Sequence, residues 1–173
     1  TRRYPNQAIS FSVGKGEVLG VAGLIGAGRS EVAQAIFGVE PPLAGSVSLD
    51  GTILAIHSAQ DAMQHGIALI PEDRRGLGLL TDWRIQENTT LATLPTYAKA
   101  GLLQTAAENK AAVKMADKLR VKAPSVAAKV SELSGGNQQK VVIAKWLLQR
   151  LNVIIFDEPT RGIDIGAKSE IYE

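Results

Sequence analysis

Residues 23–30, with the sequence GLIGAGRS, have the glycine spacing of a phosphate-binding loop. Glycines let the backbone curl so that successive N–H groups point at an anion, and Ser30 stands where a hydroxyl reaches a magnesium ion on nucleotide phosphates. Arg29 occupies the usual lysine position. Because arginine is a wider, planar group, we expect the loop to bind a nucleotide but not to drive fast hydrolysis. The predicted contact residues are Gly23, Gly26, Ala27, Gly28, Arg29, Ser30 and Glu31.

A second pattern is an apolar run at residues 153–156 that ends in two carboxylates, Asp157 and Glu158. At the carboxyl end of a parallel strand beside a phosphate loop, an aspartate can hold magnesium. The adjacent glutamate can activate a water for attack on the γ-phosphate, which makes Glu158 the predicted catalytic residue. Either motif alone also fits a ligand-free turn or helix cap, whereas the two together favour nucleotide binding.

The third pattern is Leu-Ser-Gly-Gly-Asn-Gln-Gln-Lys at residues 133–140, which opens an amphipathic segment. A serine and two glycines at a helix start can bind an anion through the hydroxyl and the free N–H groups. Serine is also a common helix cap, so Ser-Gly-Gly alone would be weak evidence. Its position just before the acidic strand favours a ligand role for Ser134, Gly135, Gly136 and Gln138.

These motifs need an α/β framework. Alternating or continuous apolar residues predict strands at 9–13 and 18–22, and a helix follows the phosphate loop at 31–37. Asp50-Gly51 after the alternating residues 46–49 predicts a hairpin.

Further along, Ser58 predicts a helix cap before a short helix that ends at His65, and residues 67–70 form a predicted buried strand. The alanine- and lysine-rich centre predicts helices at 85–94 and 106–119.

We therefore predict an α/β P-loop NTPase core with a mixed or parallel sheet, an antiparallel β part near the N-terminus and an inserted helical subdomain. Residues 1–173 would form one domain, with about 1–80 and 150–173 in the core and about 81–149 in the helical subdomain. The last helix has barely begun at Glu173, so we expect the domain to be truncated there.

Composition excludes several classes of function. The 173 residues carry a net charge of +2, which is too mild for nucleic acid as the main partner. The absence of cysteine excludes a disulfide or a thiolate nucleophile. No apolar run approaches the roughly 18 residues of a membrane span, and the first residues lack the apolar core of a signal peptide, so we expect no membrane insertion.

Together, the motifs resemble the nucleotide-binding domain of an ATP-binding cassette (ABC) transporter. Residues 23–30 resemble Walker A, 133–140 the family signature, 153–158 Walker B and 162–164 the D-loop. More narrowly, residues 26–31, 70–74, 133–140 and 157–168 are similar to the second cassette of bacterial sugar-import ATPases of the ribose/galactose/xylose type.

The resemblance implies that cassettes pair head to tail, with each ATP and its Mg²⁺ held between Walker A of one cassette and the signature of another. The partner cassette would lie in the same full-length chain. The site made by Arg29 would be the weaker of two, and closure on ATP would move membrane permease subunits through a contact near Glu72 and the helical subdomain. The protein would sit peripherally on the cytoplasmic face of the membrane.

The sequence departs from the family pattern in places. Glu72 stands where the Q-loop usually has glutamine, and it could contact magnesium or serve as a hinge. The switch histidine would lie beyond Glu173, and we expect solvated, non-catalytic positions for His57 and His65. Tyr4 is a candidate for adenine stacking, although a plain surface tyrosine fits as well. Trp83 and Trp146 are predicted to be packing residues.

Two alternatives remain open from the sequence. The cassette could be a structural or regulatory module that donates its signature and never turns over its own nucleotide, because of Arg29. A DNA-repair ATPase shares these motifs, but it would need a long coiled coil between the Walker motifs, and residues 31–156 contain no sustained heptads.

Overall fold

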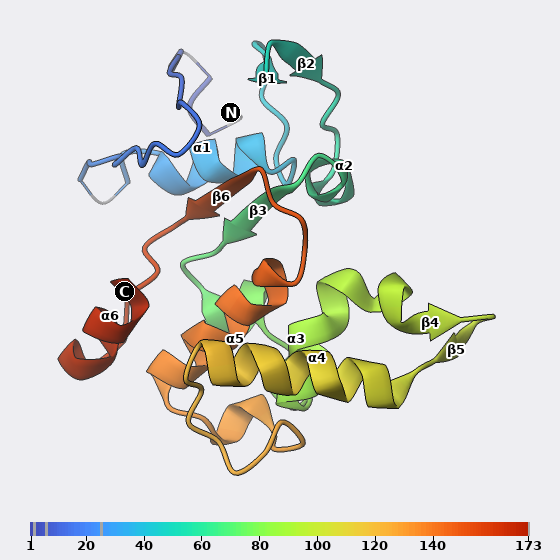
Figure 1. Ribbon diagram of the computed structural model, residues 1–173. Coiled ribbons are helices and arrows are strands. Elements are labelled where there is room, and N and C mark those ends of the chain that lie inside the picture. Colours follow the sequence, from blue (N-terminus) through green and yellow to red (C-terminus); the bar gives the residue numbers. More distant parts are fainter. Residues whose placement is uncertain (2, 6, 25, 173) are drawn as a thin grey trace. The chain divides into compact units, whose positions relative to one another are not determined.

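The computed structural model describes residues 1, 3–5, 7–24 and 26–172. These residues divide into two compact units, Thr1–Leu69 and Ile70–Glu173, whose elements are labelled in Figure 1. The first unit contains α1 (Arg29–Ile36), the strands β1 (Val47–Leu49) and β2 (Thr52–Leu54), and α2 (Ala59–Gln64). The strand β3 (Ile67–Ile70) lies at the boundary between the units, and all four of its residues are buried.

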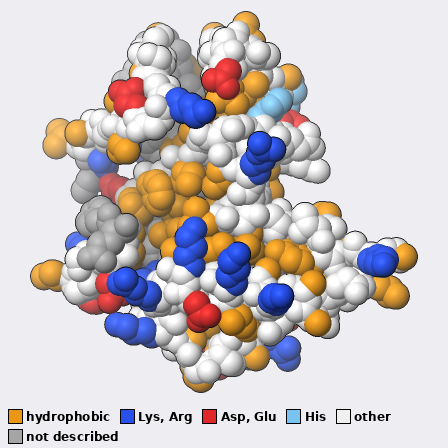
Figure 2. Space-filling model, in the orientation of Figure 1, with side chains coloured by type: hydrophobic (Ala, Val, Ile, Leu, Met, Phe, Trp, Pro, Cys, Tyr) orange, Lys and Arg blue, Asp and Glu red, His pale blue; other side chains and the backbone are white. Residues whose placement is uncertain are grey.

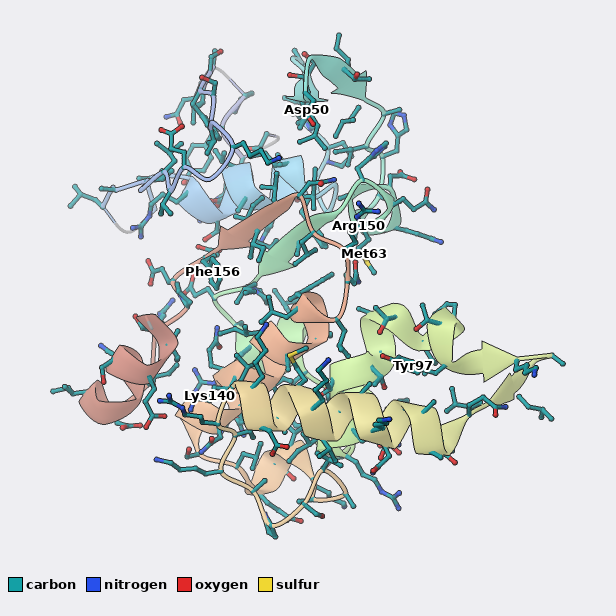
Figure 3. All side chains as sticks on the ribbon, in the orientation of Figure 1. Asp50, Met63, Tyr97, Lys140, Arg150 and Phe156 are labelled. Carbon is teal, nitrogen blue, oxygen red and sulfur yellow. The ribbon has the colours of Figure 1, made fainter. Side chains whose placement is uncertain are left out.

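The antiparallel hairpin of β1 and β2 confirms the turn that Asp50-Gly51 predicts. Val47 pairs with Leu54 and Leu49 with Thr52. Asp50 and Gly51 have φ angles of 49° and 79°, as a two-residue hairpin turn requires, and Figure 3 labels Asp50 at the tip.

The predicted helix cap at Ser58 is also confirmed. Its side chain accepts a hydrogen bond from the backbone N–H of Asp61 over 3.2 Å at the start of α2. The Asp61 carboxylate in turn accepts bonds from the His57 backbone N–H and the Ser58 hydroxyl, both at 2.9 Å. These bonds, that from His57 first, hold the pKa of Asp61 below its ordinary value.

The strands predicted at 9–13 and 18–22 are wrong, because none of the described residues of 7–24 lies in a strand. Val18 is 95% exposed and Val21 60%. An apolar run indicates which residues favour burial, but a strand also needs a neighbour that supplies backbone hydrogen bonds. Among the described residues of the first unit, β1 and β2 pair only with each other.

The second unit is mainly helical. It contains η1 (Arg74–Gly78), α3 (Ile85–Thr90), η2 (Leu91–Tyr97), β4 (Ala98–Lys99), β5 (Leu102–Leu103), α4 (Thr105–Lys118), η3 (Val130–Glu132), α5 (Gly135–Leu147), β6 (Val153–Phe156) and α6 (Ile165–Tyr172). Figure 1 shows α3, α4 and α5 packed against one another. The predicted helix at 85–94 is shorter than expected, since α3 passes into the 3₁₀ turns of η2, which contain Pro95.

The amphipathic pattern of α4 appears as predicted. Ala112 is fully buried and Met115 is 7% exposed, whereas Lys110, Lys114 and Lys118 are exposed at four-residue spacing. Figure 2 shows Lys and Arg side chains among hydrophobic ones over the helices of this unit.

A buried lysine joins the last helix to α5. The Nζ atom of Lys140, labelled in Figure 3, donates to Glu170 Oε2 over 2.6 Å and to the carbonyl oxygen of Arg120 over 3.0 Å. Lys140 is 3% exposed, so the ion pair and the carbonyl together compensate the loss of water around its ammonium group.

The helices with small antiparallel sheets give the mixed α/β character that the sequence predicts. Among the described residues no helix has the length and apolar character needed to cross a bilayer. The grouping of residues 1–80 and 150–173 into one core remains a prediction.

Candidate functional site

The predicted phosphate loop lies in the first unit and leads into α1. Gly26 and Gly28 have φ angles of +83° and +88°, a left-handed conformation that glycine adopts at little cost. Gly28 is the N-cap of α1, its carbonyl accepts the Val32 N–H over 3.0 Å, and Ser30 and Glu31 lie in the first turn. This conformation suits a backbone nest for an anion followed by a helix N-terminus.

Two residues near the chain start contact this loop. The Tyr4 hydroxyl donates to the Gly26 carbonyl oxygen over 2.5 Å, and its ring lies 3.2 Å from where a Cβ on Gly28 would stand. Arg3 forms an ion pair with Glu31 over 2.7 Å. Tyr4 therefore packs on the loop itself, and its predicted stacking on adenine remains a prediction.

The Arg29 side chain lies along the loop. Its Cδ atom is 3.6 Å from the position that a Cβ on Gly23 would take, so the absence of a side chain at Gly23 gives it room. Ala27 closes the loop by donating its N–H to the Leu24 carbonyl over 3.0 Å.

The predicted signature residues lie in the second unit, at the start of α5. Ser134 is exposed and caps the helix, where its Oγ accepts from Asn137 Nδ2 over 2.9 Å and from the Asn137 backbone N–H over 3.5 Å. Gly135 is half-buried and Gly136 buried. The serine side chain therefore lies at the surface of the unit, whereas the first residues of the helix that it caps are partly covered.

Gln138 lies one turn after Ser134 in this helix and is 1% exposed. Its Nε2 donates to the Val130 carbonyl and its Oε1 accepts from Arg75 Nε, both over 3.2 Å. Because both ends of the amide make bonds inside the unit, the structure favours a supporting role over the predicted nucleotide contact. Helical spacing could have shown this, since Gln138 lies one turn before the fully buried Val141.

The acidic residues follow β6, as the sequence predicts. The Asp157 N–H donates to the carbonyl of Ile70 over 2.9 Å, so the end of β6 lies beside the end of β3. Asp157 and Glu158 are both half-buried. Glu158 has a φ angle of 44°, a left-handed conformation that costs energy for a residue with a side chain and that is common at functional turns.

Glu72 forms an ion pair with Arg161, in the turn after β6. Its carboxylate therefore already has a cationic partner, and its predicted contact with magnesium remains a prediction. Among the described residues no group of three or more His, Cys, Asp or Glu side chains is arranged to hold a metal without other ligands.

Arg74 is a residue that sequence reasoning missed. Its Nη1 donates to the Arg161 carbonyl over 2.9 Å and its Nη2 to the Gly162 carbonyl over 3.2 Å. These partners lie almost ninety positions away in the sequence, so no local pattern indicates the contact.

The side chain of Lys145, near the end of α5, is half-buried. Its Nζ donates to the Gly78 carbonyl over 2.6 Å, and burial lowers its pKa from 10.5 to about 8. The helix that begins with the signature is thus held at both ends to the segment that follows β3.

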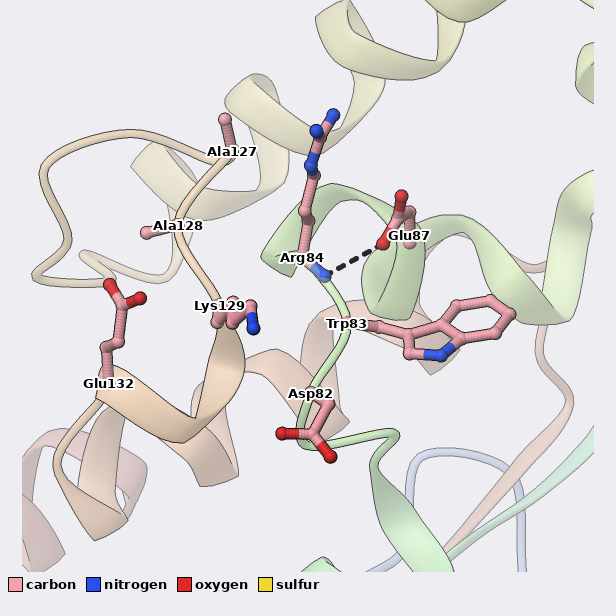
Figure 4. A pocket seen from close by; sticks show the side chains of 8 residues that line it. All are labelled: Asp82, Trp83, Arg84, Glu87, Ala127, Ala128, Lys129 and Glu132. Atoms are coloured by element: carbon pink, nitrogen blue, oxygen red, sulfur yellow. Dashed lines mark hydrogen bonds between the residues drawn. The ribbon is translucent and has the colours of Figure 1, made fainter.

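A groove of about 560 Å³ opens elsewhere in the second unit, between residues 82–87 and 127–132. Figure 4 shows its charged lining, with Arg84 and Glu87 on one side and Lys129 and Glu132 on another. The Arg84 N–H donates to Glu87 over 2.8 Å, which fixes the start of α3 at the rim. None of the predicted nucleotide-contacting residues lines this groove.

Comparison with known proteins agrees with these motifs. The chain is 51% identical over 165 residues to the ribose import ATP-binding protein RbsA 2 of Streptomyces coelicolor, covering 95% of this chain and 32% of the relative. It is 49% identical over 173 residues to the ribose import ATP-binding protein RbsA of Geobacillus kaustophilus, covering all of this chain and 35% of that protein. The chain thus spans about a third of the length of the curated relatives it matches.

The fold agrees with a solved ATP-binding cassette in a dimeric, post-hydrolysis state bound to ADP and Pi. The TM-score is 0.76 at 22% sequence identity, over 93% of this chain and 68% of the other, so the predicted P-loop NTPase fold is confirmed. A family model described as ABC transporter matches residues 6–161. Because that match takes in all three nucleotide motifs and most of the 173 residues, the chain belongs to the ABC transporter family.

Proposed function

We propose that this chain is the ATP-binding component of an ABC-type sugar importer, and that it supplies its signature to ATP held by a partner cassette. The observation that carries the proposal is the start of α5, where exposed Ser134 caps the first turn of a helix that begins with two glycines. A hydroxyl and several backbone N–H groups at one point suit a γ-phosphate presented by another surface. The similarity to ribose import ATP-binding proteins supports sugar as the cargo.

The partner cassette would lie in the same full-length chain. The relatives are about three times as long as this segment, which leaves room for a second cassette. The solved neighbour is dimeric, which supports the pairing of two cassettes. By its motifs this segment would be the second of the two.

ATP would bind with its phosphates on the phosphate loop, for which the left-handed glycines and the first turn of α1 fit well. Ser30 and Asp157 are the residues that we propose hold Mg²⁺, because a hydroxyl and a carboxylate are oxygen ligands that it prefers. Glu72 would act as a hinge, since Arg161 already neutralises it. Bound Mg²⁺ supplies charge neutralisation on the phosphates.

Hydrolysis would depend on Glu158 as the base that orients a water, while Ser134 and the α5 N-terminus of this chain bind the γ-phosphate on the partner.

Membrane permease subunits would dock near Glu72 and the helical subdomain, and the charged groove in Figure 4 is one surface of that subdomain that could receive a loop. The chain would then be peripheral on the cytoplasmic face of the membrane.

The decisive test is Ser134→Arg in the full-length protein with its membrane subunits. An arginine would put bulk at the phosphate contact, so ATP turnover should fall about a hundredfold. The matched control is Ser131→Arg, at an exposed serine three residues earlier, which should retain normal turnover. Normal turnover of Ser134→Arg would contradict the shared site.

A second candidate function is a non-hydrolysing cassette that only donates its signature. The observation in its favour is Arg29, which replaces lysine and lies along Gly23. Glu158→Gln separates the two functions, because it slows turnover only if this cassette hydrolyses its own ATP. Titration with labelled ATP and magnesium adds an independent test, since saturable micromolar binding would support a functional loop around Arg29.

A further inference from the structure

The side chain of Arg74 lies where three segments of the second unit meet. These are the loop after β3, the turn after β6 and the start of α5. Its guanidinium donates to the carbonyl oxygens of Arg161 and Gly162 over 2.9 and 3.2 Å. A Cβ on Gly135 would stand 2.7 Å from its Nη2 and 3.3 Å from the Gly162 carbonyl oxygen. The first glycine of the signature therefore makes room for Arg74.

An arginine suits this position for a geometric reason. Its planar fork carries donors on both terminal nitrogens, so it can bind two neighbouring carbonyls at once, whereas the ammonium of lysine acts as one point charge. The position is also costly, since the Arg74 Nε is buried without a hydrogen-bond partner among the described residues. Burial, and then the neighbouring charge of Arg75, lower the Arg74 pKa from its ordinary value.

Two further contacts link the loop after β3 to the turn after β6 and to α5. Glu72 forms its ion pair with the side chain of Arg161, and Arg75 Nε donates to Gln138 in the first turns of α5. Residues 72–75 thus contact the turn after β6 through Glu72 and Arg74, and α5 through Arg74 and Arg75. The turn and the helix start are each held by more than one side chain of a single loop.

We propose that Arg74 is a positioning residue that holds the turn at Arg161 and Gly162 against the start of α5, so that both move together when the cassettes close. This inference rests on the proposed function, in which the start of α5 binds the γ-phosphate of ATP on the partner cassette. Arg74 itself touches no nucleotide in this scheme. It fixes the direction in which Ser134 presents its hydroxyl.

The test is Arg74→Lys in the full-length protein with its membrane subunits. Lysine keeps the charge but not the fork, so kcat for ATP should fall about tenfold, because a misplaced contact weakens the transition state. The KM for ATP should change by less than about twofold, since binding to the partner's phosphate loop is unaffected. The melting temperature should stay within about 2 °C, which excludes general unfolding as the cause.

The matched control is Arg150→Lys, the same replacement at an exposed arginine after α5, labelled in Figure 3. It should leave kcat unchanged. Wild-type kcat for Arg74→Lys, or a loss accompanied by an equal loss in Arg150→Lys, would overturn the proposal.

A charge exchange tests the ion pair between Glu72 and Arg161 without altering Arg74. Glu72→Arg and Arg161→Glu each place like charges together, so each should reduce kcat, and the double variant should recover at least about half of the loss by restoring an ion pair. A double variant no better than the worse single variant would contradict the coupling of loop and turn.

Failure of this inference is distinguishable from failure of the proposed function. If Ser134→Arg abolishes turnover while Arg74→Lys is normal, the shared site stands and the role of Arg74 is wrong. If Ser134→Arg is normal, the shared site itself is wrong, whatever Arg74→Lys does.

Discussion

The helices α1 and α5 both begin at glycine-rich segments that suit phosphate groups, and they are held by different means. The start of α1 has no side-chain cap, and its shape comes from the left-handed Gly26 and Gly28. The start of α5 has a serine cap, with Arg74 against Gly135 and Arg75 against the buried Gln138. The proposed phosphate site at α1 is thus shaped by backbone conformation, and the proposed one at α5 is held by side chains.

The contacts of the two sites differ in exposure as well. Arg3, which pairs with Glu31 beside the phosphate loop, has a side chain that is 71% exposed, so water screens that pair. The amide of Gln138 and the Nε of Arg74 are buried. A site whose donors are fixed before the ligand arrives loses less entropy on binding. Under the proposed function, the start of α5 would therefore be prepared for its phosphate, and the phosphate loop would adjust to its nucleotide.

The variant Gly135→Ala tests most directly whether side chains hold the start of α5. The added methyl group would stand 2.7 Å from the Arg74 guanidinium and displace it, so ATP turnover in the full-length protein should fall about tenfold, as in Arg74→Lys. Gly166→Ala is the control, because its methyl group would stand 3.6 Å from the nearest side chain and within ordinary contact distance. Equal turnover in the two variants would remove Arg74 and Gly135 from the description of the site.

Local signals explain what the sequence predicted of this fold. Asp50-Gly51, the Ser58 cap and the Ser134 cap each act within a few residues, and each produces its element in the structure. The strands predicted at 9–13 and 18–22 depend on pairing with distant segments, which periodicity cannot supply. The hairpin of β4 and β5 was missed because its turn is Ala100-Gly101, which lacks the asparagine or aspartate of a strong signal.

The same distinction applies to the candidate site. Ser134, Asp157 and Glu158 are recognisable because their motifs are contiguous. Arg74 is not, because its partners come from the turn after β6 and from α5, and only the folded chain brings them together. Roles that depend on such distant contacts cannot be inferred from spacing.

Near the other end of α5, the contact of Lys145 with Gly78 should make the stability of the protein depend on pH. Burial places the Lys145 pKa at about 8, below its ordinary 10.5, so between these values the unfolded chain holds more protons than the folded one. The free energy of unfolding should therefore rise with pH, by about 2 kcal/mol from pH 8 to about 9.5 for this group. Lys145→Met should remove that rise.

Urea unfolding at several pH values measures the effect, and Lys114→Met, which removes an exposed ammonium from α4, is the control. The control should keep the wild-type dependence on pH. If Lys145→Met keeps it too, Lys145 does not titrate in its contact with Gly78, and this anchor of α5 is weaker than its burial indicates.

The smallest effect is expected at the phosphate loop. Glu31→Gln removes the charge that Arg3 pairs with, and because Arg3 is largely exposed the free energy of unfolding should fall by less than about 0.5 kcal/mol. Urea unfolding beside Glu40→Gln, an exposed glutamate after α1, checks the value, and the two variants should agree within error. A loss above about 2 kcal/mol would mean that side chains hold the phosphate loop as firmly as they hold α5. The division into a backbone-built and a side-chain-built site would then fail, since ion pairing at α1 would equal in strength the hydrogen bonds of Arg74 and Arg75.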